Sequence, residues 1–204
     1  MKTLSLFPLE MVAFPSQEVN LHIFEPRYKQ LIRDCDSERN SFGIISIEKG
    51  TLREYGTEMK LLEIVKRYPD GRMDIRSVGV STFRLLNYKE KMPEKLYPGG
   101  QVVEIEATDD GDLELAEKIL RSLGKLFTEL GVQRDLRGKN VYQIAHYVGM
   151  SGEEEYRLLT TPSEKERQVM MLIHLKRILP AIRRGKLIRE RIKKNGHFRN
   201  VDSI

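Results

Sequence analysis

The chain has 204 residues, of which 40% are apolar and 32% are charged, and its formal net charge is +5. This composition is typical of soluble globular proteins, and the length suits one domain or two small ones. No apolar segment approaches the ~20 residues that span a bilayer, and Pro8, Glu10 and Pro15 interrupt the run that a signal peptide needs. One cysteine, Cys35, excludes an internal disulfide, so we expect a cytoplasmic protein that does not contact the membrane.

The first half of the chain predicts strands and turns. Seven short apolar segments, which together predict about six strands, lie at residues 4–6, 20–24, 42–47, 57–68, 72–80, 83–85 and 103–107. Pro69-Asp70-Gly71 predicts a hairpin turn, because proline presets the first central position and glycine accepts a positive φ. So many short strands have to close into a barrel or sandwich to protect their edges.

One helix is expected within this half. Pro26 suits a first helical turn, where a missing N–H has no consequence. Tyr28, Leu31, Ile32 and Cys35 then fall at i, i+3, i+4 and i+7 and form one apolar stripe. We therefore expect Cys35 to be a small buried side chain rather than a nucleophile.

After the aspartate-rich segment 109–112, the apolar residues recur at the spacing of an α-helix. The aspartate-rich segment itself indicates a loop and a helix cap. Helices are expected over residues 116–130, 141–148 and 153–159, and a long final helix is expected to open at Pro162-Ser163. Pro180 and Gly185 predict a kink or break in the final helix. The part of the helix beyond this kink would contact either the β-domain or a second copy of the chain, and in the second case the protein would be a homodimer.

The positive charge lies in the C-terminal part of the chain. Residues 162–204 hold twelve Lys/Arg and four Asp/Glu, whereas residues 1–161 hold twenty-three and twenty-six. A basic segment either attracts polyanions or forms the solvated face of a helix, and the solvated face is the more common case. The basic residues concerned are Arg183, Arg184, Lys186, Arg189, Arg191, Lys193 and Lys194.

The order of these pieces resembles the N-terminal substrate-binding domain of the Lon proteases. The motifs that carry the resemblance are Phe7-Pro8-Leu9 with Val12, Phe14 and Pro15, then Ile23-Phe24-Glu25-Pro26-Arg27-Tyr28, Phe42-Gly43, Tyr55-Gly56-Thr57, Pro69-Asp70-Gly71-Arg72, and Gly79 with Phe83-Arg84-Leu85. Together they cover about residues 4–107. The helices that follow look like the helical half of free-standing bacterial members.

The resemblance implies an α+β fold. Residues 1–108 would form a PUA-like β pseudo-barrel of about six strands with one inserted helix. Residues 109–204 would form a helical bundle that ends in a long kinked basic helix. The resemblance also implies a protein-binding module that recognises exposed or unfolded protein segments in protein quality control, with a protease or chaperone as a further partner.

No catalytic chemistry is expected. The phosphate-binding loop G-x-x-x-x-G-K-[ST] of the Lon ATPase module does not occur in this sequence, so no nucleotide cofactor is predicted. The histidines, His22, His146, His174 and His197, lack the i, i+4 spacing of a zinc helix, and no metal site is predicted. The alternative function is nucleic-acid binding through the PUA-like barrel and the basic final helix, with affinity that falls steeply with salt.

The sequence offers two groups of binding residues. The loop 89–100 presents Met92, Pro93, Leu96 and Tyr97 among charges, and apolar loop residues of this kind either contact other proteins or fold back over the barrel mouth. Glu25 and Arg27 flank the start of the first helix. They either contact a bound segment or form a helix cap and an ion pair, and the structural role is favoured.

Overall fold

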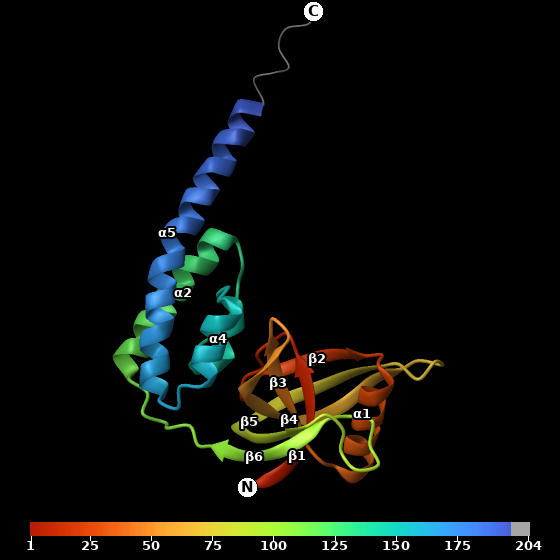
Figure 1. Ribbon diagram of the computed structural model, residues 1–204. Helices are drawn as coiled ribbons and strands as arrows, with labels where there is room; N and C mark the ends of the chain where they lie inside the picture. The colour runs from red at the N-terminus through yellow and green to blue at the C-terminus, as the bar shows by residue number, and fades with distance from the viewer. Residues whose placement is uncertain (197–204) are drawn as a thin grey trace, which may run out of the picture. The chain divides into compact units, whose positions relative to one another are not determined.

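The computed structural model describes residues 1–196, and the side chains of residues 186 and 189–196 lie outside the description (Figure 1). The chain divides into two compact units. The first contains residues 1–109 and 142–163, and the second contains residues 110–141 and the chain from residue 164 onward. The helices between 142 and 163 thus group with the strands. The division into folding domains at residue 108 stays a prediction.

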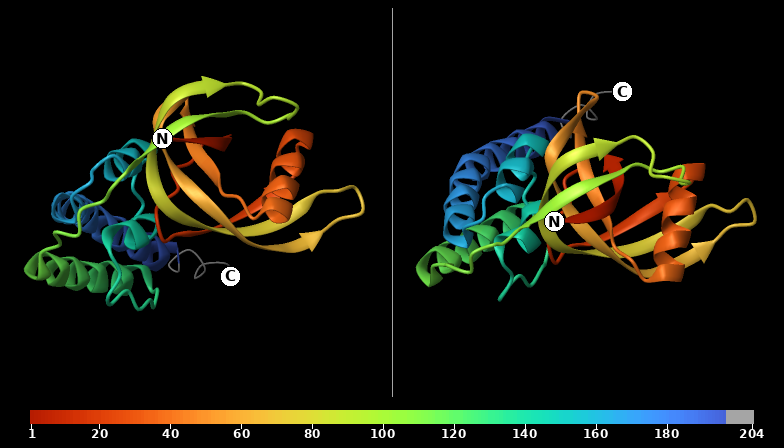
Figure 2. Two further views of the ribbon diagram at one scale, coloured as in Figure 1. Left: turned by 90° about the horizontal axis from the view of Figure 1, so that it is seen from below. Right: turned by 60° about the horizontal axis from the view of Figure 1, so that its bottom comes forward.

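The strands of the first unit form a closed sheet, in agreement with the predicted α+β fold. They are β1 (Lys2–Leu9), β2 (Glu18–Ile23), β3 (Phe42–Glu48), β4 (Thr51–Arg67), β5 (Met73–Lys89) and β6 (Gly99–Ile105). Their order is β2-β5-β4-β3-β1-β6, and an additional pairing of β5 with β6 closes a ring that leaves only β2 outside (Figure 2). β1 and β3 run parallel, and the other neighbours run antiparallel. Closure joins the two edges that a flat sheet of the ring strands would leave free.

Two strands are longer than the sequence predicts. β4 and β5 each run for 17 residues, and Phe83 and Leu85, expected in a separate strand, continue β5. Register shifts along the β4–β5 pairing bend these strands without ending them. β5 can therefore pair with β2 through its first half and with β6 through its second. The turn between β4 and β5 is the predicted one, with Gly71 at a φ of 79°.

The inserted helix α1 (Pro26–Glu38) buries the predicted stripe of Tyr28, Leu31, Ile32 and Cys35. These side chains share one hydrophobic core with the strands, and the ring of Phe7 stacks on Tyr28 with centroids 3.9 Å apart. Burial raises the pKa of Cys35 to about 12, so its thiol carries no charge at neutral pH. A buried, uncharged thiol is a packing residue.

Three short helical segments follow later in the chain: α3 (Val141–Ile144), the 3₁₀ helix η1 (Ala145–Tyr147) and α4 (Gly152–Leu159). Phe14 is fully buried, and its ring stacks on Tyr142 with centroids 5.4 Å apart. α4 begins at a capping box, in which Ser151 and Glu154 each satisfy the other's backbone N–H. The stacked rings hold α3 beside the strands of the first unit.

The second unit pairs α2 (Leu113–Leu130) with α5 (Glu164–Gly196). As predicted, α2 starts at a capping aspartate, Asp112, whose side chain accepts a hydrogen bond from Leu115 N at 3.0 Å. It ends at Gly131, which takes a φ of 68°.

The expected break in the final helix is wrong, because α5 continues through Pro180 and Gly185. Proline removes one backbone N–H, whereas the hydrogen bonds on either side of it still hold a long helix together. The kink stays a prediction. Among residues 1–196, no helix has both the length and the apolar character required to cross a membrane.

Candidate protein-binding site

The predicted binding loop lies alongside α1 (Figure 2). The backbone N–H of Leu96 donates to Oε1 of Gln30 at 2.7 Å, and the hydroxyl of Tyr97 donates to Oδ2 of Asp34 at 2.7 Å. We name the surface formed by Glu25, α1 and the loop of residues 90–98 the α1–loop surface. The segments that form it contain all six predicted binding residues, of which Tyr97 is buried: Glu25, Arg27, Met92, Pro93, Leu96 and Tyr97.

The loop is anchored at Asp34. Tyr97 is only 4% exposed and belongs to the hydrophobic core, and Lys95 forms an ion pair with Asp34 at 2.8 Å. Partial burial raises the pKa of Asp34, but the hydrogen bonds from Lys95 and Tyr97 outweigh it and lower the pKa below its ordinary value. The loop is therefore held on α1 by a buried ring and a charged hydrogen-bond acceptor.

The loop combines both expected arrangements. Met92 packs against the core together with Tyr97, which is the fold-back arrangement. Pro93 and Leu96 remain exposed, as a binding surface requires. Two further apolar side chains are exposed at the ends of the neighbouring strands: Phe24 directly after β2 and Tyr88 near the end of β5.

Glu25 and Arg27 form the predicted ion pair, with the guanidinium and the carboxylate 2.8 Å apart. The Glu25 side chain makes no cap hydrogen bond to α1, so the predicted cap is absent. The Arg27 guanidinium lies over the ring of Tyr28, 4.5 Å from its centroid. Both charged side chains remain partly exposed on the α1–loop surface, where they can contact a partner.

Only two residues of the predicted basic patch have described side chains. Arg183 pairs with Glu129 of α2 at 3.1 Å, and Arg184 is exposed. Lys186, Arg189, Arg191, Lys193 and Lys194 lie outside the described side chains. The patch is therefore described only at its first two positions, and one of these is already neutralised.

The histidines do not converge. His22 Nδ1 lies 2.5 Å from Asp74, His146 Nδ1 lies 3.1 Å from Glu155, His174 is buried in α5, and His197 lies outside the described residues. Within the described part of the chain, no group of three or more His, Cys, Asp or Glu side chains could hold a metal ion.

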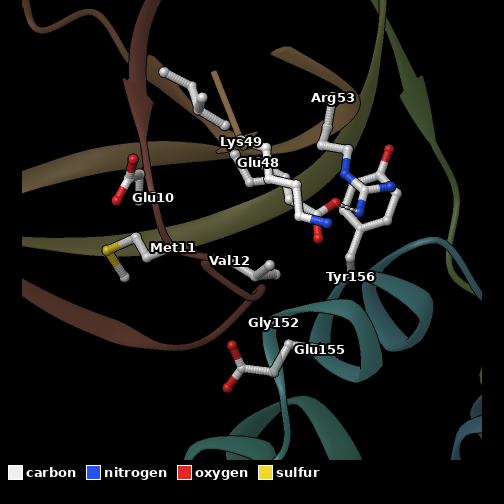
Figure 3. Close-up of a pocket in the computed structure, with 11 residues that line it drawn as sticks. Glu10, Met11, Val12, Glu48, Lys49, Arg53, Gly152, Glu155 and Tyr156 are labelled. Carbon is white, nitrogen blue, oxygen red and sulfur yellow. Dashed lines mark hydrogen bonds and ion pairs between the residues drawn. The ribbon is translucent and has the colours of Figure 1, made fainter. Parts of the chain in front are cut away.

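A pocket in the first unit was not foreseen from the sequence. It has a volume of about 580 Å³ and lies between β3, the start of β4 and α4 (Figure 3). Its lining residues are Glu10, Met11, Val12, Ser46, Ile47, Glu48, Lys49, Arg53, Gly152, Glu155 and Tyr156. We name it the Arg53 pocket. It combines apolar walls with charged groups, as ligand sites commonly do.

A strand irregularity places Arg53 in this pocket. Ile45 pairs with Gly56 and Ile47 pairs with Leu52, so three residues of β4 lie opposite Ser46 alone. Such bulges redirect side chains, and they occur next to functional sites.

The redirected guanidinium is held on several sides. Arg53 forms ion pairs with Glu48 and with Glu153 of α4, and it lies 4.6 Å above the ring of Tyr156. The Tyr156 hydroxyl in turn accepts a hydrogen bond from Tyr55 N at 3.1 Å. These contacts fix one wall of the Arg53 pocket between strand and helix.

A second hollow, of about 590 Å³, is lined by residues of β2, β4 and β5. It is lined mainly by polar side chains, among them Glu18, His22 and Arg76. The carboxylate of Asp74 accepts from Tyr68 at 2.7 Å and pairs with His22, and Arg76 pairs with Glu63. The charged groups of this hollow are thus largely satisfied by one another.

Comparison with known proteins agrees with the resemblance seen in the sequence. Residues 3–177 match the family model described as the ATP-dependent protease La (LON) substrate-binding domain. The fold is similar to a crystal structure of a Lon N-terminal domain protein from Xanthomonas campestris, with 25% identity and a TM-score of 0.68 over 85% of this chain and 98% of that chain. It is also similar to the N-terminal domain of a Mycobacterium avium complex Lon protease, with 13% identity and a TM-score of 0.65 over 86% and 98% of the two chains. The second likeness shows the fold alone.

Proposed function

The chain belongs to the family of Lon substrate-binding domains, and we propose that it is a non-catalytic module that binds exposed or unfolded segments of other proteins. The match over residues 3–177 carries this proposal, because it spans both the closed sheet and most of the helical part. The bound segment would be a client in protein quality control. A protease or chaperone would then receive it.

We place the client on the α1–loop surface. Leu96 is 51% exposed and sits on a loop that Tyr97 and Lys95 fix to α1. A fixed platform loses little conformational entropy when it binds, so more of the contact energy appears as affinity. The client itself becomes ordered, which keeps the affinity modest.

Binding without catalysis is consistent with the chemistry of the described residues. Cys35 is the one thiol of the chain, and its raised pKa and its burial remove it as a nucleophile. The same lone cysteine supports a cytoplasmic location, where thiols stay reduced.

Salt dependence tests the proposal against the nucleic-acid alternative. The full chain is titrated into a fluorescently labelled, chemically unfolded protein and, separately, into a labelled single-stranded RNA, from about 0.1 M to about 1 M NaCl. We expect client binding to persist at high salt because apolar contacts carry it. Tight RNA binding that collapses with salt, without client binding, would favour the basic helix and the alternative function.

The homodimer through the C-terminal helix stays a prediction. Leu187 and Ile188 are exposed on α5 and offer an apolar contact. Sedimentation equilibrium of the full chain and of its Leu187→Glu variant tests the homodimer. A dimer through this helix should be seen for the unsubstituted chain and should dissociate in the variant.

A further inference from the structure

The Arg53 pocket contains an unsatisfied polar group. Ser46 lines the pocket and is 8% exposed, and its Oγ has no hydrogen-bond partner among the residues that the structure describes. Buried hydroxyls are normally paired, because an unpaired one loses its hydrogen bonds to water without replacement. An orphaned hydroxyl in the wall of a pocket points to a ligand that supplies the missing partner.

The lining of the pocket holds more carboxylates than cations: three carboxylates, Glu10, Glu48 and Glu155, against two cations, Lys49 and Arg53. Lys49 is a cation with no ion pair among the described residues. The Arg53 guanidinium is already shared between Glu48 and a further carboxylate, that of Glu153.

One carboxylate is open to a new partner. Glu10 is exposed and has no ion pair among the described residues, while Glu155 pairs with His146. Glu10 and Met11 lie on one side of the pocket, opposite Arg53 and Tyr156 (Figure 3). An added positive charge on the Glu10 side would therefore be attracted, whereas an added carboxylate there would be repelled.

The apolar lining limits the shape of that cation. Met11, Val12 and Ile47 add aliphatic surface to the lining, and methionine adapts to varied partners. A ligand with a flexible hydrocarbon stem and a cationic end would cover this surface and still reach Glu10. Lysine and arginine side chains have this form, and their N–H groups can donate to Ser46 Oγ as well as to a carboxylate.

We propose that the Arg53 pocket binds a lysine or arginine side chain of the client, with the stem against Met11 and Ile47 and the cationic end at Glu10 and Ser46. This inference rests on the proposed function and names the client's side-chain class. Clients would thus be selected by a basic residue in the Arg53 pocket, in addition to apolar contacts on the α1–loop surface.

The test uses short fluorescein-labelled peptides of Gly, Ser and Leu with one central lysine, norleucine or glutamate. Norleucine keeps a four-carbon stem without the ammonium group. Anisotropy titration of the full chain should give about 3–10-fold tighter binding for the lysine peptide than for the norleucine peptide, and weaker binding still for glutamate. Equal affinity for lysine and norleucine overturns the proposal.

Variants locate the effect. Glu10→Gln should abolish most of the lysine preference, and Ser46→Ala should reduce it. Glu18→Gln, an exposed glutamate in the second hollow, is the matched control and should leave the preference intact. A preference that survives Glu10→Gln, or that Glu18→Gln removes equally, places the cation elsewhere and overturns the proposal.

Two readouts separate the possible failures. If the full chain binds an unfolded protein but no peptide shows a charge preference, the pocket proposal fails and the proposed function stands. If neither ligand binds, the proposed function fails as well. Self-association that Glu10→Gln removes, measured by sedimentation at the same concentrations, would make a second copy the occupant and also overturns the proposal.

Discussion

Replacing Tyr97 by phenylalanine should loosen the loop that forms half of the α1–loop surface. The substitution keeps the buried ring and removes only the hydroxyl that donates to Asp34 at 2.7 Å. A hydrogen bond to a charged acceptor contributes about 1.5–3 kcal/mol when buried. The Asp34 side chain is 24% exposed, so we expect a loss of about 1–2 kcal/mol, equivalent to roughly 2–4 °C in Tm for each kcal/mol.

The loss should depend on pH. Hydrogen bonds hold the pKa of Asp34 below its ordinary value in the folded chain, despite the opposing effect of burial. Its contribution to stability is therefore present above the unfolded pKa of about 3.9 and disappears as the pH falls through the folded value. The difference between Tyr97→Phe and the unsubstituted chain should be full at neutral pH and should shrink in acid.

Urea unfolding followed by circular dichroism measures the difference, with Asp34→Asn as the partner in a double-mutant cycle. Tyr97→Phe should cost less in the Asp34→Asn background, because the acceptor there is neutral. A cost below about 0.3 kcal/mol, or an equal cost in both backgrounds, would show that the hydroxyl does not anchor the loop.

Three further predictions concern buried groups of the first unit. Ser46→Ala should raise the free energy of unfolding by about 1 kcal/mol in urea titration, because it removes a buried hydroxyl that has no partner among the described residues. A lower free energy of unfolding in the variant would mean that the hydroxyl is paired. Glu58→Gln should lower the free energy of unfolding by about 1–3 kcal/mol at neutral pH and by less in acid. Burial raises the pKa of Glu58, but the hydrogen bonds from Lys2 and Ser41 outweigh it and lower the pKa overall, so the carboxylate stabilises the fold only above its folded pKa. A loss that does not change with pH in guanidinium unfolding would contradict this. Cys35 should react with a disulfide reagent only after unfolding, and rapid modification of the native chain would refute its burial.

Local sequence signals were sufficient for the elements whose geometry is set by neighbours in the chain. The turn at Gly71, the buried stripe of α1 and the ends of α2 all follow from residue type and spacing, and all are confirmed. Each depends on φ preferences, capping or helical periodicity, which act over a few residues.

The sequence did not predict features that join distant segments. Closure of the sheet was predicted, but the strands that close it were not: β6 pairs with both β1 and β5, and no local pattern specifies such contacts. The length of β5 was missed because a bulged strand bends and continues where its alternating sequence pattern is interrupted.

The Arg53 pocket was missed for the same reason, since Arg53 and Glu153 are separated by 100 positions in the chain. One signal was available: Ser46 is a polar residue within the otherwise apolar run of β3. A polar side chain in a strand that is buried on both faces needs a hydrogen-bond partner, either within the protein or in a bound ligand.

The most direct test of the central proposal compares two leucines of similar exposure on the same unit. Leu96 on the α1–loop surface is 51% exposed and Leu62 on β4 is 43% exposed, so replacing either by serine removes a similar apolar area. We predict that Leu96→Ser weakens binding of an unfolded client about 3–10-fold in anisotropy titration, while Leu62→Ser leaves it unchanged. Equal affinities for the two variants would contradict the assignment of client binding to the α1–loop surface.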